Sequence, residues 1–282
     1  MLFSSSTDEG DLEIPLFYAK IASMRIDLHN HTTRCNHATG TMEAYVQRAI
    51  ELGIDQYGFS EHAPMKFDPH YRLAFEEIDA YEADVLRLRE QYHHQIDILL
   101  GYEVDFLEGY IEDTLFQRPV DYLIGSVHFL KQWGFDNPEF IGEYKNRDID
   151  EIWQEYFDAI EAMAKRGYFD IVGHLDLIKV FKFMPKKDIR LIAQSALKAI
   201  KKSNMVIELN SAGLRKPISE IYPSPSLLEV AYELNIPITF SSDAHAIEQI
   251  GFKYETVTSV AKKIGYTKAV TFKQREPQMV IF

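Results

Sequence analysis

The chain has 282 residues, of which 46% are apolar and 26% are charged, so it can bury a sizeable core. Its formal net charge of −13 at pH 7, with no Lys/Arg-rich run, excludes broad electrostatic binding to a polyanion such as nucleic acid. Cys35 is the single cysteine, which excludes a disulfide framework within the chain, and no apolar run reaches transmembrane length.

The first 23 residues differ from the rest of the chain. They are polar around 4–11 and lack the basic segment and long apolar run of a signal peptide. They could form an ordered strap packed through the apolar residues of 14–18, or an extension upstream of a natural start at Met24, and we favour the second. We therefore predict residues 1–23 as an N-terminal extension, disordered or not native, and 24–282 as a single barrel domain. The single cysteine fits a reducing compartment, and we expect a cytoplasmic location.

Beyond Met24, short apolar runs alternate with longer amphipathic segments, which is typical of α/β proteins. The strands are expected at 25–28, 56–59, 96–100, 121–124, 169–172, 206–209 and 237–240. The helices are expected at about 42–52, 75–92, 109–116, 149–166, 186–202, 226–234 and 254–264, and a last apolar run covers 269–272. The segment 130–148 has no predicted element, and loops of this length often act as lids.

The predicted strands favour one architecture. Most are continuously apolar, which suits a parallel sheet covered by helices on both faces. Seven such units without a linker favour a closed or nearly closed α/β barrel, with an open doubly wound sheet as the alternative. The Gly-rich dinucleotide fingerprint expected after the first strand in that alternative is absent.

Histidines and carboxylates follow the predicted strands. His29 and His31 end the first strand, and because side chains alternate along a strand, both can face one point. In a barrel, the C-terminal ends of all strands lie on one face, so residues after the later strands would converge there. The nine candidate metal ligands are His29, His31, His37, His62, Glu103, His128, His174, Asp243 and His245.

Nine candidates are too many for one ion that keeps an open position, since such an ion takes three or four protein ligands. We predict two or three clustered divalent ions with a bridging carboxylate, and mixed imidazole and carboxylate ligation suits Zn, Mn or Fe. Such clusters generate hydroxide near neutral pH and stabilise phosphoryl oxygens during in-line displacement. A structural site would need fewer ligands and would favour cysteine, so we expect a catalytic centre. Cys35 lies among the ligands in the sequence and is interpreted as a small buried side chain that does not bind metal.

A resemblance rests on the residues at these strand ends and covers the chain from Met24. The motifs are His29-x-His31 with His37, Glu61-His62, Gly101-x-Glu103, Ser126-Val127-His128, Gly173-His174-x-Asp176, Glu208-Leu209-Asn210 and Ser242-Asp243-Ala244-His245. In these motifs the chain resembles the PHP (polymerase and histidinol phosphatase) superfamily of metal-dependent phosphoesterases. The motif Gly213-Leu214-Arg215 is similar to the monofunctional histidinol-phosphatases. The resemblance implies a distorted (β/α)7 TIM-like barrel with the metal site at the C-terminal ends of the strands.

The resemblance also implies how the ligands divide among three ions. The first ion would be held by His29, His31, Glu103 and Asp243. The second ion would share Glu103 and take His128 and His174. The third ion would be held by His37, His62 and His245.

Three further residues are predicted to be catalytic, namely Glu61, Asp176 and Arg215. Glu61 would orient a ligand ring by accepting its free N–H. Asp176 would either donate a proton to the leaving group or orient a metal ligand without binding the metal itself, and we favour the second. Arg215 is expected to bind phosphate because a guanidinium matches phosphate oxygens bidentately. The resemblance implies a basic residue near the fifth position after His174, so Lys179 is a second candidate for phosphate binding.

We therefore predict a phosphomonoesterase that converts L-histidinol phosphate to L-histidinol and phosphate in histidine biosynthesis. Its partner would be a small-molecule phosphate monoester, with no nucleic acid and no membrane, and the oligomeric state stays open. The nearest alternative is a PHP phosphoesterase for another small phosphate ester or nucleotide. Two others are an amidohydrolase, which usually needs a lysine where His128 ends the fourth strand, and a non-catalytic metal module that stabilises a partner protein.

Overall fold

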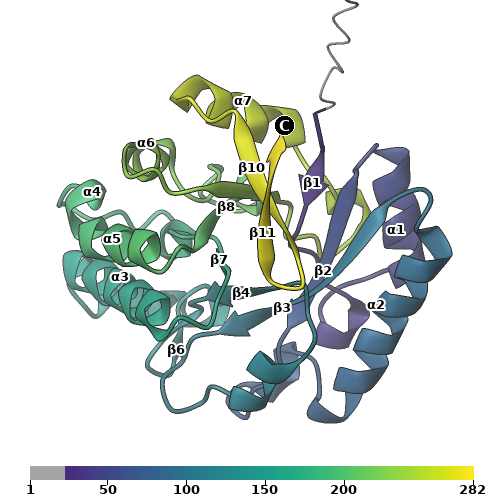
Figure 1. Ribbon diagram of the computed structural model, residues 1–282. Helices are drawn as coiled ribbons and strands as arrows, with labels where there is room; N and C mark the ends of the chain where they lie inside the picture. Colours follow the sequence, from purple (N-terminus) through teal and green to yellow (C-terminus); the bar gives the residue numbers. More distant parts are fainter. Residues whose placement is uncertain (1–22) are drawn as a thin grey trace, which may run out of the picture.

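A computed structural model describes residues 23–282. The predicted N-terminal extension, 1–23, lies outside the described residues except for Ser23, so that expectation stays a prediction. Seven parallel strands form one sheet in the order β1-β2-β3-β4-β7-β8-β9 (Figure 1). They are β1 (Ile26–Asp27), β2 (Gln56–His62), β3 (Asp97–Asp105), β4 (Tyr122–Ser126), β7 (Ile171–Val172), β8 (Val206–Asn210) and β9 (Ile238–Ser241).

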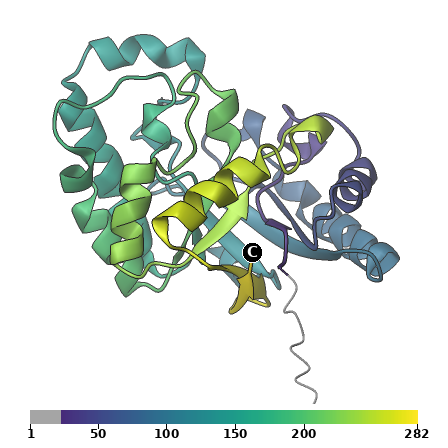
Figure 2. The same cartoon turned by 90° about the horizontal axis from the view of Figure 1, so that it is seen from above.

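Helices connect the strands and cover the outside of the sheet, as Figure 2 shows from above. They are α1 (Met42–Glu51), α2 (Ile78–Tyr92), α3 (Ile149–Arg166), α4 (Ile189–Ile192), α5 (Gln194–Lys202), α6 (Pro225–Glu233) and α7 (Tyr254–Ile264). The longest helix, α3, begins after Asp148, whose side chain accepts a hydrogen bond from Asp150 N, and it ends at Gly167 with φ 71°. Among residues 23–282, no helix is long and apolar enough to cross a membrane.

The first and last strands of the sheet meet at a seam made by Asp27, Leu28, Phe240 and Ser242. Leu28 N donates a hydrogen bond to Phe240 O at 3.0 Å. The buried Asp27 carboxylate accepts hydrogen bonds from Ser242 N at 2.8 Å and Ser242 Oγ at 2.6 Å, across 215 sequence positions. The sheet is thus a nearly closed barrel, and the predicted distorted (β/α)7 fold is confirmed.

An antiparallel hairpin closes the end of the barrel opposite the ligand candidates (Figure 1). Its strands are β10 (Lys268–Lys273) and β11 (Glu276–Ile281). Val270 and Phe272 of β10 are buried in one apolar cluster with residues from β3, β4, β7 and β8. At the turn, Arg275 N donates to Asp121 O at 2.8 Å, directly before β4 begins. The sequence indicated the apolar run of β10 but not its pairing with β11.

Several predicted boundaries differ from the structure. β3 continues to Asp105, beyond the predicted end at 100, because it pairs with β2 and β4 through residues whose polar side chains hide the apolar pattern. The helix predicted at 109–116 is a short 3₁₀ helix at Asp113–Gln117, and the one predicted at 186–202 is divided into α4 and α5. The segment predicted without an element contains a small hairpin and a 3₁₀ helix. These are β5 (Phe129–Leu130), β6 (Trp133–Gly134) and the 3₁₀ helix Pro138–Lys145.

Candidate metal centre

The predicted ligands converge at the C-terminal ends of the strands. A cavity of about 840 Å³ opens there. Its walls include seven of the nine predicted metal ligands, namely His37, His62, Glu103, His128, His174, Asp243 and His245. The other two, His29 and His31, are fully buried beside them. The barrel therefore gathers residues that are up to 216 positions apart in the sequence, from His29 to His245, around one cavity.

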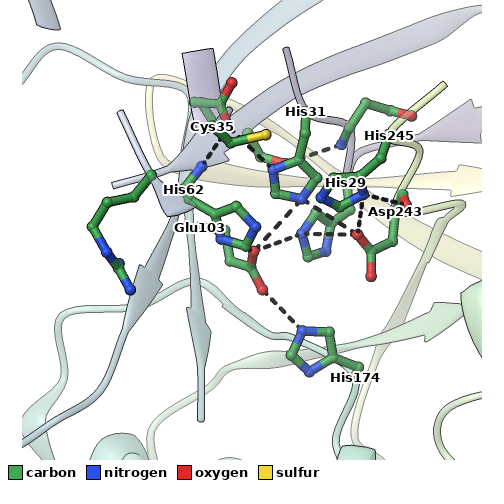
Figure 3. Close-up of polar contacts among 12 residues, drawn as sticks. His29, His31, Cys35, His62, Glu103, His174, Asp243 and His245 are labelled. Carbon is green, nitrogen blue, oxygen red and sulfur yellow. Dashed lines mark hydrogen bonds and ion pairs between the residues drawn. The ribbon is translucent and has the colours of Figure 1, made fainter. Parts of the chain in front are cut away.

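Glu103 lies at the centre of this cluster (Figure 3). Its Oε2 is 2.9 Å from His62 Nδ1 and 3.2 Å from His29 Nε2, and its Oε1 is 2.9 Å from His174 Nε2. The side chain is 1% exposed, so both oxygens face protein groups. A carboxylate whose two oxygens contact different imidazoles can bridge two ions.

Four groups of side chains have ligand atoms within 4.8 Å of one another and could each hold a metal ion. They are His29, His31 and Glu103; Glu103, His128 and His174; His31, His62 and His245; and Cys35, His37 and His245. The second group has the composition predicted for the second ion. Asp243 is outside the first group, although its Oδ1 lies 3.3 Å from His31 Nε2. The set predicted for the third ion is divided between the last two groups, which also include His31 and Cys35.

The donor atoms of the cluster fit a divalent cation. Four ring nitrogens are buried without a hydrogen bond to any residue of 23–282. They are Nε2 of His29, His31 and His245 and Nδ1 of His174. Two of these nitrogens, His29 Nε2 and His31 Nε2, lie 3.2 and 3.3 Å from carboxylate oxygens of Glu103 and Asp243 without making a hydrogen bond, which is the arrangement expected of donor atoms that share a cation. Imidazole nitrogens with carboxylate oxygens are the donor set that Zn and similar metals take.

The charges of the cluster also favour a cation. Burial disfavours the charged form of Glu103, yet the surrounding imidazoles, His29 first, hold its pKa well below its ordinary value. Burial likewise opposes protonation of His31, but its contact with Asp243 raises the pKa to about 9. Burial and the neighbouring His31 lower the pKa of His62 to about 4, so this ring is neutral and keeps a free lone pair. The carboxylates thus attract positive charge, and the neutral His62 ring offers a ligand atom.

Three of the imidazoles each contact, through Nδ1, a buried carboxylate that is not itself a predicted metal ligand. The pairs are His29 with Glu208 at 2.9 Å, His31 with Glu61 at 3.3 Å, and His128 with Asp105 at 2.6 Å. A carboxylate that holds the Nδ1 proton fixes the tautomer and the ring orientation and leaves Nε2 for a metal. Glu61, which was expected to orient a ligand ring, is one of these partners and also accepts a hydrogen bond from Thr32 N at 2.8 Å.

Sequence reasoning missed the other two partners, Asp105 and Glu208. Asp105 is two residues after Glu103 on β3, so both side chains lie on the same face of the strand. The spacing of two residues between Glu103 and Asp105 could have indicated that both face the site, but the predicted strand ended at residue 100. Glu208 was noted only as part of a motif, although it is a buried acid within a predicted apolar strand.

Comparison with known proteins agrees with this geometry. The family model of the PHP domain matches residues 27–212. The chain belongs to the PHP domain family. A relative from Deinococcus radiodurans named "Probable histidinol-phosphatase" is 37% identical over 257 residues, covering 89% of this chain and 98% of that protein. The "Histidinol-phosphatase" of Bacillus subtilis is 29% identical, covering 81% of this chain and 96% of that protein. These relatives place the chain in the histidinol-phosphatase branch of the family.

A solved structure shares the fold of this PHP protein. It is the histidinol phosphate phosphatase of Lactococcus lactis in complex with zinc, L-histidinol and phosphate. The TM-score is 0.77 at 21% sequence identity, and the match covers 90% of this chain and 98% of that chain. The likeness supports the barrel described above.

Arg215 lies at the wall of the PHP cavity. Its Nη2 donates hydrogen bonds to Ser242 O at 2.9 Å and Asp243 O at 3.0 Å, and its guanidinium carbon is 5.3 Å from the centre of the Phe252 ring. Its Nη1 is buried and makes no hydrogen bond within the described part of the chain. The guanidinium is therefore fixed on one side while a donor on the other side stays unused.

Lys179 does not reach the cavity, and its predicted contact with phosphate is corrected. Its Nζ is fully buried and lies 2.9 Å from Asp176 Oδ2, 2.7 Å from Glu220 Oε2 and 2.8 Å from Ile221 O. Asp176 is equally buried, accepts a hydrogen bond from Ser224 N at 2.8 Å, and does not line the cavity either. Lys179 was proposed because relatives that resemble this chain carry a basic residue near this position, but here its side chain forms ion pairs with Asp176 and Glu220.

The segment 130–148 supplies part of the cavity wall that the sequence did not identify. Asp136 lines the cavity. Burial raises the pKa of Asp136 above its ordinary value, although His128 and His174 partly oppose this. Phe140 of the same segment and Phe129 just before it line the cavity as well. This wall thus combines an acid with aromatic rings.

Proposed function

We propose that this protein is a metal-dependent phosphomonoesterase that hydrolyses L-histidinol phosphate to L-histidinol and phosphate. The observation that carries the proposal is the cluster around Glu103, where imidazoles and carboxylates from six strand ends face one cavity. The choice of substrate is supported by the name of the Deinococcus radiodurans relative and by the share of the two chains that the match covers. The ligands of the Lactococcus lactis structure are consistent with it.

The cluster would hold two or three divalent ions, with Zn, Mn or Fe as the candidates. The residues that would bind them are His29, His31, His37, His62, Glu103, His128, His174, Asp243 and His245. When bound, such ions supply Lewis acidity, which activates water near neutral pH and offsets charge on phosphoryl oxygens. Glu61, Asp105 and Glu208 would keep the ligand rings oriented.

Arg215 would bind the phosphoryl group through its unused Nη1. The hydrogen bonds from Nη2 to Ser242 O and Asp243 O already fix the plane of the guanidinium, so little side-chain entropy is lost on binding. A guanidinium donates to phosphate oxygens in a fixed geometry, and the same contact strengthens as charge builds on those oxygens. Asp243 supplies the carbonyl that Arg215 holds, so the phosphate donor and a metal ligand are positioned together.

The other end of the substrate would face Asp136 and the aromatic wall. L-histidinol phosphate carries an ammonium group and an imidazole ring beside its phosphate. Burial disfavours the charged form of the Asp136 carboxylate, and an ammonium group beside it would balance that charge. The rings of Phe129 and Phe140 offer apolar area for the imidazole. The cavity therefore offers Arg215 to the phosphate group and Asp136 to the ammonium group of a zwitterionic phosphate ester.

A substrate panel tests the proposed function. Phosphate release should be fastest from L-histidinol phosphate, exceeding kcat/KM for glycerol phosphate and for nucleoside monophosphates by at least about 100-fold, because those esters lack the ammonium group. The metal content should be measured on the same sample and should be at least two divalent ions per chain, as the bridging position of Glu103 requires. A preference for a nucleotide or another ester would show that L-histidinol phosphate is not the substrate. Full activity in a metal-free sample would overturn the metal-dependent mechanism.

Replacing Asp136 by Asn should raise KM for L-histidinol phosphate by about 10- to 100-fold, since hydrogen bonds to charged groups contribute about 1.5–3 kcal/mol. The kcat/KM for glycerol phosphate, which has no ammonium group, should change by less than about twofold. Steady-state kinetics on both esters checks this. Glu139→Gln, an exposed acid on the same segment, is the matched control. An equal loss on both esters would show that Asp136 supports the cavity rather than the ammonium group.

A further inference from the structure

The hydroxyl of Tyr222 is an unused donor at the metal cavity. Tyr222 lines the cavity and is 1% exposed. Its hydroxyl makes no hydrogen bond to any residue in the part of the chain that the structure describes. Buried tyrosine hydroxyls usually have a partner, so this one indicates a ligand. Burial also raises the pKa of Tyr222 above its ordinary value, so the phenol keeps its proton and acts as a donor.

Tyr222 is presented next to the phosphate-binding candidate Arg215. Both residues lie in the segment that follows β8, and Tyr222 is bridged to Asn210 at the end of that strand by hydrogen bonds of 2.7 and 3.0 Å. Gly213 allows this approach, because a Cβ there would lie 2.0 Å from Glu220 O and 3.0 Å from Tyr222 Cε2. Both Arg215 Nη1 and the Tyr222 hydroxyl are buried donors without a partner within 23–282.

The Tyr222 ring also faces the metal cluster. Its centroid is 6.4 Å from that of His174, with the two rings nearly perpendicular. Tyr222 thus lies beside a candidate metal ligand, in the cavity wall that also contains Arg215. Removing such donors at developing charge has large effects on rate in other enzymes.

Asp176 and Lys179 anchor the segment that carries Tyr222. Lys179 Nζ binds Glu220 Oε2 at 2.7 Å and Ile221 O at 2.8 Å, immediately before Tyr222. Asp176 Oδ2 accepts a hydrogen bond from Ser224 N at 2.8 Å, two residues after it. The buried ion pair therefore holds both flanks of Tyr222, although neither member of the pair reaches the cavity.

We propose that the Tyr222 hydroxyl donates a hydrogen bond to the phosphoryl group beside Arg215, and that Asp176 and Lys179 are positioning residues for it. This inference rests on the proposed function, because it assumes that the cavity binds a phosphate ester. It assigns Tyr222 to substrate binding. It also gives the fully buried Lys179 and Asp176 a role next to the cavity, although neither of them lines it.

The test compares wild type with Tyr222→Phe, which removes only the hydroxyl. The Kd for inorganic phosphate, measured by calorimetry on the metal-loaded protein, should rise about tenfold, and kcat/KM for L-histidinol phosphate and for p-nitrophenyl phosphate should fall about 10- to 100-fold. Metal content should not change. Tyr266→Phe is the control, because the Tyr266 hydroxyl is bound to Ile236 O at 3.0 Å and lies outside the cavity wall. An unchanged Kd for phosphate in Tyr222→Phe, or no phosphate binding by the wild type, would overturn the inference.

A double-mutant cycle tests the positioning role of Lys179. Lys179→Met should weaken phosphate binding in the wild-type background and should have little further effect in the Tyr222→Phe background, because both changes remove the same contact. Additive effects would show that Lys179 acts through general stability instead. If the wild type hydrolyses p-nitrophenyl phosphate but not L-histidinol phosphate, the proposed substrate fails, and the phosphate Kd values still decide the role of Tyr222.

Discussion

Glu103→Gln is expected to lower kcat/KM for L-histidinol phosphate by at least about 10³-fold, since even groups that only orient metal ligands contribute about 10- to 100-fold. Glu103 contacts imidazoles through both oxygens, at 2.9 Å from His62 and 2.9 Å from His174. The amide keeps the shape of the side chain but removes its charge and one of its two acceptor oxygens, so it cannot bridge two ions. The number of metal ions per chain, measured by mass spectrometry, should therefore fall together with the rate.

The control for this variant is Glu90→Gln, which changes an exposed carboxylate on α2 far from the cavity. It should leave both the metal content and kcat/KM within about twofold of wild type. Circular dichroism should show that Glu103→Gln is folded, because the substitution preserves volume. A folded Glu103→Gln protein with wild-type metal content and activity would contradict a bridging role for this residue.

Arg215→Met is expected to reduce kcat/KM by about 10²–10³-fold, the range found when one donor to a developing oxyanion is removed. The loss should be similar for L-histidinol phosphate and p-nitrophenyl phosphate, because Arg215 would contact the group that the two esters share. Arg215→Lys should recover part of the rate, since a lysine restores the charge but not the planar fork. Initial rates with both esters, and inhibition by inorganic phosphate, measure these effects.

Arg215 also holds the backbone around a metal-ligand candidate, through Ser242 O and Asp243 O. Metal content therefore has to be determined for each variant. Loss of metal in proportion to the loss of rate would show that Arg215 supports Asp243 rather than binding phosphate. Arg48→Met, an exposed change on α1 paired only with Glu51 among the residues that the structure describes, should leave the rate unchanged.

The barrel could be predicted from the sequence because its strands are short, apolar and regularly interrupted by amphipathic helices. The residues at which the helices and strands end were harder to predict from the sequence. β3 continues through Glu103 to Asp105, where functional polar side chains replace the apolar pattern, so the rule that identifies a buried strand fails at the site itself. The pairing of β10 with β11 was not predictable because the exposed residues of β11 carry no apolar alternation.

Most of the candidate metal centre could be predicted because its residues share one structural position, the C-terminal end of a strand. Residues that do not lie at the C-terminal end of a strand were misplaced or missed. Lys179 was placed near the substrate because relatives that resemble this chain carry a basic residue there, but its side chain is buried and pairs with Glu220. Asp136 and Tyr222 are on irregular segments, and their position depends on tertiary packing that local sequence does not encode.

The seam between the first and last strands has a thermodynamic consequence. His29 and His31 follow β1, whereas Asp243 and His245 follow β9, so two ligand pairs come together only when Asp27 and Ser242 join the two edges of the sheet. An ion held by both pairs binds the closed barrel and not the open chain. By mass action, each ion bound there shifts the equilibrium toward closure, and closure raises affinity for the ion by the same factor. With ions held by these four residues, folding and metal uptake would be one linked equilibrium, and stability would depend on the metal concentration.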